Sequence, residues 1–264
     1  MTLLKECCSL LTDGDWIESK DQSESGIRLI QTGNIGNGEF LEKEGRAKYI
    51  SEETFRRLGC TEIFPGDILI SRLPEPVGRA CLIPDKAERM ITAVDCSILR
   101  IDESVINKKF FLFFLKSSKY YNQLTGKLAG TTRVRISRKN LEKVSLTIPS
   151  MAEQNRIANV LGQLDRIIKA RKAQLSALDE LVKARFVEMF GDCSVNSKKF
   201  VSHKGVDLFK FSSGKFLPEE KRLKEGIPVY GGNGIAWYTD SPLIDFPTIV
   251  IGRVGALCGN IHIV

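Results

Sequence analysis

Residues 64–72 read Phe-Pro-Gly-Asp-Ile-Leu-Ile-Ser-Arg, and residues 246–253 repeat them as Phe-Pro-Thr-Ile-Val-Ile-Gly-Arg. Each copy is a proline-containing turn followed by alternating isoleucines, a pattern that predicts a short strand. The first copy continues to Gly78, which we align with Gly255 in the second copy. An internal repeat indicates one structural module built twice, so it takes precedence in the fold prediction.

Two further landmarks occur upstream in both copies and in the same order. Gly14-Asp15-Trp16 is matched by Gly214-Lys215-Phe216, and Gly26-Ile27 is matched by Gly226-Ile227. The match needs gaps, and the alternative is that Gly, Pro and Ile recur by chance; the shared order of the landmarks argues against chance. A long amphipathic segment, residues 150–190, separates the copies. The sequence therefore predicts a module, a spacer and a second module.

Composition excludes several classes of site. The 264 residues suffice for one large or two ordinary domains. Seven cysteines without a Cys-x-x-Cys pair, and only two histidines, argue against a zinc site and against a disulfide framework. Free thiols suit a reducing compartment, and no signal peptide or membrane-spanning run is recognised. We expect a cytoplasmic protein without a metal or cofactor.

Positive charge is concentrated in one segment. Between Ser104 and Leu141 there are nine Lys or Arg residues and no Asp or Glu. Such a segment predicts a polyanionic partner, and nucleic acid is the natural one. The alternative is a solvated basic face that is balanced in space by acids from elsewhere, such as Glu39 and Glu42.

The same segment predicts a helix and a loop. Aromatic residues between 104 and 124 follow a helical period and suit a buried helix that ends near Gly126. We interpret these aromatic side chains as core rather than as a platform for stacking bases. The following loop, residues 126–138, is rich in Gly, Thr and Arg.

A long helix is predicted from Ser150, whose spacing to Glu153 is that of a capping box. Its apolar residues alternate at intervals of three and four, which is a heptad seam that requires a partner helix. The seam, interrupted by Arg171, consists of Ile157, Leu161, Leu164, Ile168, Leu175, Leu178 and Val182. About 35 residues give a rod of roughly 50 Å, longer than the roughly 34 Å turn of B-DNA.

Taken together, these motifs resemble the DNA-specificity subunit of type I restriction–modification systems. The resemblance is carried by the runs 32–35, 65–71 and 130–132 and, most specifically, by Ile148-Pro149 leading into Glu153-Gln154-Asn155-Arg156-Ile157. It covers the whole chain. It implies a non-catalytic subunit in which two recognition modules each read half of a split DNA site. The spacer helices would set the distance between the half-sites and dock the methyltransferase subunits, and restriction subunits would join through these.

We therefore expect an α/β protein made of target-recognition domains with a twisted β-sheet and flanking helices. The first recognition domain would span residues 1–149, the spacer helix 150–191, and a partial second recognition domain 192–264. The second copy stops at Val264, so the chain looks truncated relative to the family pattern. Members with one recognition module can act as homodimers, so self-association through the spacer is also open.

The basic residues near the loop are the candidate DNA contacts. The full set is Arg133, Arg135, Arg138, Lys139, Lys127, Lys116, Lys119, Arg72, Arg79 and Arg253. The first four are candidates for base edges, because arginine pairs well with guanine, and the three lysines that follow are candidates for phosphate. For Arg72 and Arg79, flanking a proline-rich loop, binding to nearby carbonyls or acids is an equally good interpretation.

No catalytic motif is present in the sequence. A methyltransferase loop and a phosphate-binding Gly-x-x-x-x-Gly-Lys loop are both absent. Asp207, Glu219 and Lys221 have a spacing loosely compatible with a metal-dependent nuclease, but a solvated charged loop is the better interpretation. The main functional alternative is a structural adaptor that docks a methyltransferase, or a second copy of itself, without reading DNA.

Overall fold

The computed structural model describes residues 1–130 and 134–264. Its contacts divide the chain into two compact units, Met1–Ala184 (the N-terminal unit) and Arg185–Val264 (the C-terminal unit). In the described residues, no helix combines the length and the apolar character that crossing a bilayer requires.

A four-stranded antiparallel sheet forms one half of the N-terminal unit. Its order is β2 (Cys8–Asp13), β10 (Cys96–Ile101), β7 (Ile68–Ser71) and β8 (Ala80–Leu82). Every residue of β7 is buried, since the strand is paired on both edges and covered on both faces. The strand predicted from residues 64–72 is thus confirmed.

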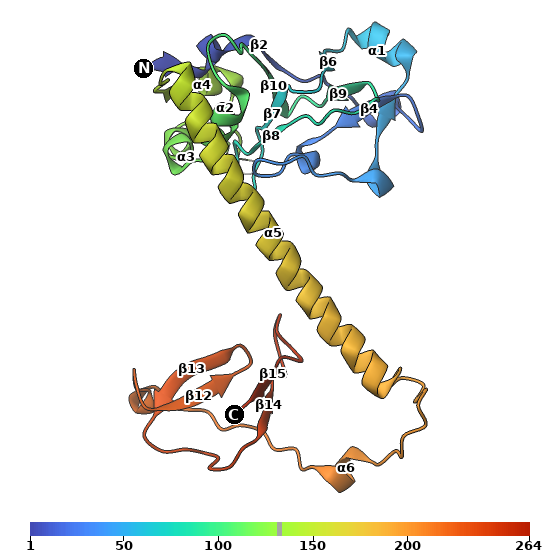
Figure 1. Cartoon of the computed structure of the whole chain (residues 1–264), viewed down its shortest axis with the longest axis vertical. Coiled ribbons are helices and arrows are strands. Elements are labelled where there is room, and N and C mark those ends of the chain that lie inside the picture. The colour runs from blue at the N-terminus through green and yellow to red at the C-terminus, as the bar shows by residue number, and fades with distance from the viewer. Residues whose placement is uncertain (131–133) are drawn as a thin grey trace. The chain divides into compact units, whose positions relative to one another are not determined.

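A second, five-stranded sheet lies beside the first (Figure 1). Its order is β3 (Gln22–Ser23), β5 (Tyr49–Ile50), β4 (Ile27–Ile30), β9 (Met90–Thr92) and β6 (Glu62–Ile63), and only β4 and β9 run parallel. Helix α1 (Glu52–Leu58) is capped by Ser51 and ends at the left-handed Gly59. An apolar cluster that includes Ile30, Leu69 and Ile98 joins side chains from both sheets into one core.

Three short helices cover the first sheet: α2 (Lys108–Leu115), α3 (Ser118–Thr125) and α4 (Arg138–Glu142) (Figure 1). The sequence predicted one helix over 104–124. The structure breaks it at Ser117, because the Ser117 hydroxyl accepts the Tyr120 N–H and starts α3 afresh. Phe111 and Tyr120 are fully buried, which confirms that the aromatic residues form core.

The short remaining elements of this unit complete its connections. They are β1 (Thr2–Leu3), paired with β11 (Ser145–Leu146), and the 3-10 turns Leu4–Cys7, Ser19–Asp21, Thr32–Asn34 and Glu44–Arg46.

The long helix is α5 (Met151–Phe190). Its 40 residues correspond to about 60 Å. Gln154 and Ala158 are its buried residues, and from Arg166 to Phe190 every side chain is exposed. The predicted spacer helix is confirmed, and its predicted bounds of 150 and 191 lie one residue outside the observed ends. The division into three domains stays a prediction.

The C-terminal unit contains two hairpins. Strand β12 (Ile227–Gly231) pairs with β13 (Gly234–Thr239), and β14 (Ile249–Ile251) pairs with β15 (Ile261–Ile263). Helix α6 (Gly205–Leu208) and the 3-10 turn Glu219–Lys221 precede them.

The hairpins of the two units repeat one local topology. The Gly78 N–H donates to Ser71 O, and the Gly259 N–H donates to Gly252 O. Gly78 and Gly259 have φ values of +90° and +92°. The alignment of Gly78 with Gly255 is therefore wrong: the match is Gly259, because both loops contain six residues between the paired positions. Gly255 also has a positive φ, but it lies inside that loop.

The upstream landmark is repeated as well. Gly26 and Gly226 have φ values of +125° and +132°, and each directly precedes a strand, β4 or β12. A side chain at either glycine would meet a carbonyl oxygen of the neighbouring strand or its edge, at 2.5 Å from Ile50 O and 2.8 Å from Thr239 O. The recurrence of Gly-Ile therefore has a steric cause in both units.

Candidate nucleic-acid interface

Arg72 holds the end of the predicted DNA-contact loop. It is buried, and its Nε donates to Ile136 O at 3.0 Å while the Ile136 N–H donates to Arg72 O at 3.1 Å. Its Nη1 lies 2.7 Å from Asp13 Oδ2 and donates to Val94 O at 3.3 Å. A buried guanidinium with these partners is not available to a ligand, so the structure favours the structural interpretation that the sequence left open.

Arg79 has a similar role. Its Nε donates to Ile35 O at 2.7 Å, and its two other nitrogens donate to Thr32 O at 2.8 Å and Leu73 O at 3.0 Å. It thereby ties the turn after β4 to the loop between β7 and β8. We interpret Arg79, like Arg72, as a residue that positions loops rather than one that contacts DNA.

Arg253 repeats the contact of Arg72 in the C-terminal unit. Its Nη1 donates to Ser213 Oγ at 3.2 Å. Ser213 precedes Gly214 as Asp13 precedes Gly14, so the two contacts join equivalent positions. Arg253 is exposed, however, and a neutral hydroxyl replaces the carboxylate. The positive charge of Arg253 therefore remains available to a ligand.

The loop between α3 and α4 is closed by a backbone pair. The Ala129 and Arg135 N–H groups donate to each other's carbonyl oxygens at 2.9 and 2.8 Å. Arg133 lies outside the described residues. The side chain of Arg135 is exposed and has no acidic partner in the described part of the chain.

Four further basic residues lie on or beside this loop: Lys119 on α3, Lys127 just after α3, and Arg138 and Lys139 on α4. Lys119 and Lys139 are exposed, Lys127 is half-buried, and none has an acidic partner among residues 1–130 and 134–264. Arg138 Nε lies 3.2 Å from Glu142 Oε1, one turn along α4. The segment 119–139 thus presents several uncompensated positive charges.

Lys116 is placed differently from its prediction as a phosphate contact. Its Nζ lies 3.3 Å from Asp165 Oδ1 on α5 and 5.2 Å from the centre of the Phe113 ring. Its charge is already compensated within the protein. It belongs to the junction between α2 and α5 rather than to the free basic surface.

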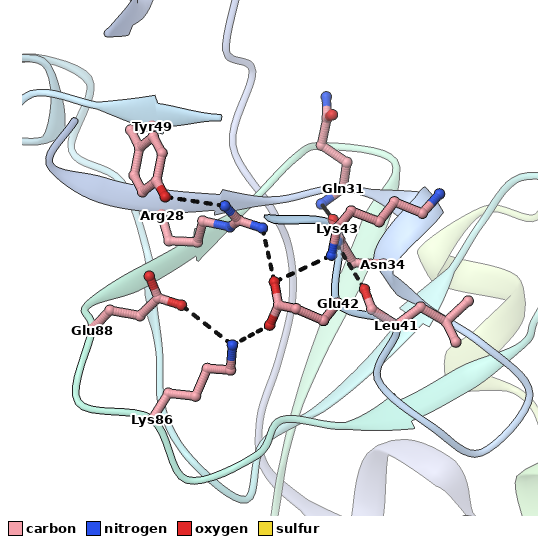
Figure 2. Close-up of polar contacts among 9 residues, drawn as sticks. All are labelled: Arg28, Gln31, Asn34, Leu41, Glu42, Lys43, Tyr49, Lys86 and Glu88. Carbon is pink, nitrogen blue, oxygen red and sulfur yellow. Dashed lines mark hydrogen bonds and ion pairs between the residues drawn. The ribbon is translucent and has the colours of Figure 1, made fainter. Parts of the chain in front are cut away.

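The acids expected to balance the basic segment are engaged elsewhere. Glu42 accepts hydrogen bonds from Arg28 Nη2 and from Lys86, and Tyr49 accepts a further one from Arg28 (Figure 2). The hydrogen bond from Lys86 is the main reason that the pKa of Glu42 lies below its ordinary value. Glu39 lies 3.6 Å from Lys169 on α5. Neither acid pairs with the described residues of the segment 119–139, whose charge stays positive.

The predicted seam of α5 lies open over most of its length. Ile157 and Leu161 are half-buried, whereas the later members are at least half exposed: Leu164, Ile168, Leu175, Leu178 and Val182. Leu175 is 64% exposed and Val182 70%. An amphipathic helix that exposes such a seam is typical of an unfilled helix interface.

The suggested nuclease residues do not form a visible centre. Asp207 lies on α6, and Glu219 and Lys221 lie on the 3-10 turn Glu219–Lys221. Within the described ranges, no three His, Cys, Asp or Glu side chains are grouped so that they could hold a metal ion.

Comparison with known families decides the context of this basic surface and open helix. The family described as the type I restriction modification DNA specificity domain matches residues 3–177. The chain belongs to this family. The resemblance seen in the sequence motifs is thereby confirmed.

Several relatives of this specificity family are similar over most of the chain. A putative type I restriction enzyme specificity subunit, MjaX, from Methanocaldococcus jannaschii is 24% identical over 91% of this chain. A putative type I specificity subunit from Mycoplasma genitalium is 26% identical over 87% of it. The matches cover 60% and 63% of these relatives, so the chain spans about three fifths of their length.

Solved structures of specificity subunits share the fold. The type I S subunit from M. genitalium has a TM-score of 0.56 at 21% identity, covering 96% of this chain and 65% of that one. The HsdS subunit from Thermoanaerobacter tengcongensis has a TM-score of 0.51 at 16% identity, covering 95% and 66%. These likenesses confirm the α/β fold class. The relatives are named as specificity subunits, in agreement with the prediction of a non-catalytic subunit.

Sequence reasoning missed the residues that join α5 to the recognition fold. Gln154 is 1% exposed, and its Oε1 accepts the Asn107 N–H at 2.7 Å. Asp165 joins Lys116 to Lys169. Gln154 could have been found from its place in the most specific family motif. The sequence contains no signal for Asp165, because this residue does not interrupt the apolar pattern of the helix.

Proposed function

We propose that this specificity-family chain reads DNA with the segment 119–139 and its surroundings. The supporting observation is that Lys119, Lys127, Arg135 and Lys139 lack acidic partners in the described residues, while Arg72 holds the loop between them by its end at Ile136. Uncompensated Lys and Arg supply phosphate affinity, and a held loop can present side chains to base edges. Arg133 is proposed as a base contact on its sequence position.

We further propose that the open seam of α5 docks methyltransferase subunits, so that modification and restriction are supplied by partners. The support is the exposure of Leu164, Leu175 and Val182 on one long helix. Burying such residues in a helical interface is favourable by roughly 25 cal/mol per Å² of apolar surface. Two recognition surfaces on one rod would then read the two halves of a split site.

The test is site-specific methylation. The chain is expressed with the methyltransferase subunits of its own system in a host that lacks both, and the genome is sequenced for methylated bases. We expect one bipartite motif that disappears when the gene for this chain is removed. A complex that forms but shows no DNA preference would contradict the reading role and support the adaptor alternative. Light scattering of the purified chain would then show whether the seam pairs two copies.

A further inference from the structure

Helix α2 runs beside the first turns of α5 and is attached to it at both ends. Asn107 caps the start of α2 by accepting the Phe110 N–H at 2.9 Å, and Lys116 follows its last residue. The two residues contact α5 at two separate places. The direction of α5 within the N-terminal unit therefore depends on these two attachments.

The first attachment is a set of buried hydrogen bonds. Gln154 Oε1 accepts the Asn107 N–H at 2.7 Å, and Gln154 Nε2 donates to Pro149 O at 3.0 Å. Beside it, Asn107 Nδ2 donates to Asn155 Oδ1 at 2.8 Å. Because Gln154 is 1% exposed, these bonds are protected from water and hold the start of α5 firmly.

The second attachment is a group of four alternating charges. Lys116 lies 3.3 Å from one oxygen of Asp165, and Lys169 lies 3.2 Å from the other. Lys169 also reaches Glu39, in the loop after Gly38, at 3.6 Å. A side chain at Gly38 would come within 2.6 Å of Lys116 Cδ, so the backbone there confines the stem of Lys116.

We propose that the two attachments act as clips that fix the direction in which α5 extends from the sheets of the N-terminal unit. The first clip is Gln154 with Asn107, and the second clip is Lys116, Asp165 and Lys169. This inference rests on the proposed function for its consequence: the direction of α5 sets the separation of the two DNA half-sites. Between the two clips, Ala158 is buried and Ile157 and Leu161 are half-buried, so the second clip is the outermost contact that limits a pivot of the helix about Gln154. Two clips eleven residues apart, about 16 Å along the axis, remove that freedom.

The geometry of the helix amplifies any movement at the second clip. Ser176 is twice as far along α5 from Gln154 as Asp165 is, so a displacement of about 2 Å at Asp165 moves Ser176 by about 4 Å. A step of one base pair in DNA is about 3.4 Å. A pivot of this size is therefore comparable to one base-pair step of half-site spacing.

Stability is a poor readout for this clip and orientation is a good one. The pairs of Asp165 are partly exposed, and ion pairs near the surface contribute only about 0–1 kcal/mol, so Asp165→Ala leaves the fold intact. Spin labels are placed on Ser25→Cys and Ser176→Cys, both exposed in the N-terminal unit, after the exposed Cys193 and Cys258 are replaced by serine. The matched control is Glu180→Ala, whose pair with Lys183 lies on the exposed part of α5.

We expect a single narrow distance in the parent and in Glu180→Ala, and a distribution shifted or broadened by about 4 Å in Asp165→Ala at an unchanged melting temperature. An Asp165→Ala distribution equal to that of the parent would overturn the proposal. The distance measurement needs no DNA, so its outcome does not depend on whether the proposed function is correct.

The consequence for DNA is tested in the complex with the methyltransferase subunits, on sites whose spacer is lengthened or shortened by single base pairs. We expect Asp165→Ala to methylate neighbouring spacings that the wild type rejects, with the half-site bases unchanged. An identical spacing preference would overturn the link between the clip and half-site separation. A wild-type complex without any site preference would contradict the proposed function, while the distances would still decide the clip.

Discussion

Arg72, which follows β7, and Arg135, in the loop between α3 and α4, both lie next to Ile136, yet their guanidinium groups have opposite surroundings. Arg72 is buried and bonded to Ile136 O, Val94 O and Asp13, whereas the neighbour of Ile136, Arg135, is exposed and has no acidic partner in the described residues. One arginine builds the loop and the other is free to bind. Residue type alone does not separate these roles, because both are arginines in a basic, glycine-containing context.

Removing two free charges should weaken DNA binding and its dependence on salt. For Arg135→Ala combined with Lys139→Ala, we expect the slope of log affinity against log salt to become smaller by about two. The reason is that DNA binding releases fewer counterions when two phosphate contacts are lost. The control is Lys20→Ala with Arg56→Ala, which removes two charges that are paired with Glu18 and Glu52. Equal slopes in both double variants, measured by fluorescence anisotropy, would show that only net charge matters.

Glu42 should make stability depend on pH. Its pKa is lowered, first by the hydrogen bond from Lys86, so its contribution is present above the unfolded pKa of about 4.3 and is lost as pH falls through the folded value. We expect Glu42→Gln to lower the free energy of unfolding by about 1–2 kcal/mol at pH 7 and by less below about pH 4. Urea unfolding across this range measures the difference. Glu53→Gln, an exposed change, should show no such trend.

At the scale of elements, Gly78 connects the β7–β8 hairpin to α3. A side chain there would lie 2.2 Å from Leu124 Cδ1, and the Tyr120 hydroxyl donates to Gly78 O at 3.0 Å. The two elements approach so closely because Gly78 has no side chain and adopts a φ of +90°.

Gly78→Ala should destabilise the N-terminal unit more than a change at another left-handed glycine. We expect about 2–4 kcal/mol, combining backbone strain with overpacking against Leu124. Gly59→Ala isolates the strain, since Gly59 has a φ of +63° and open space around it, and should cost about 1 kcal/mol. Denaturant unfolding of both variants tests this. Equal losses would mean that α3 moves away without cost.

The seam of α5 should be needed for docking but not for folding. We expect Leu175→Glu with Leu178→Glu to abolish binding to the methyltransferase subunits, because charges cannot be buried in an apolar helix interface. The free energy of unfolding should change by less than about 0.5 kcal/mol, since both side chains are mostly exposed. Ala173→Glu with Ser176→Glu adds the same charge off the seam and should still bind in a co-purification assay.

On the scale of the whole molecule, the two units share local hairpin topology but differ in how completely the equivalent strands are buried. Strand β7 has neighbours on both edges, and Ile68 and Ile70 are fully buried. Its counterpart β14 pairs only with β15 among the described residues, and Ile249 and Ile251 are 62% and 45% exposed. Similar sequence patterns therefore lie in unlike environments.

This difference predicts unequal local stability. In hydrogen exchange measured by mass spectrometry, peptides covering β14 should exchange faster than peptides covering β7, because few buried contacts oppose the opening of β14. The intact chain serves as its own control. Equal protection of the two strands would show that the C-terminal hairpins are stabilised by contacts other than those seen within their unit.

Local signals in the sequence sufficed for the repeat, the long helix and the family motifs, because turns, caps and periodicity act between residues close in the chain. They also indicated a basic segment. The break at Ser117 could have been found by its capping hydroxyl, but the aromatic period obscured it. The match of Gly78 to Gly259 needed the hairpin hydrogen bonds, since several glycines fit the sequence equally well.

Which charges are free was decided only by tertiary structure. Lys116 and Arg72 are as basic in the sequence as Lys119 and Arg135, but Asp165 and Asp13, distant in the chain, lie beside the first two. Likewise Gln154 and Asn107 meet across 47 residues to hold α5 in place. Pairing of this kind depends on how the chain is brought together in space, and an electrostatic contact leaves no periodic trace in the order of the residues.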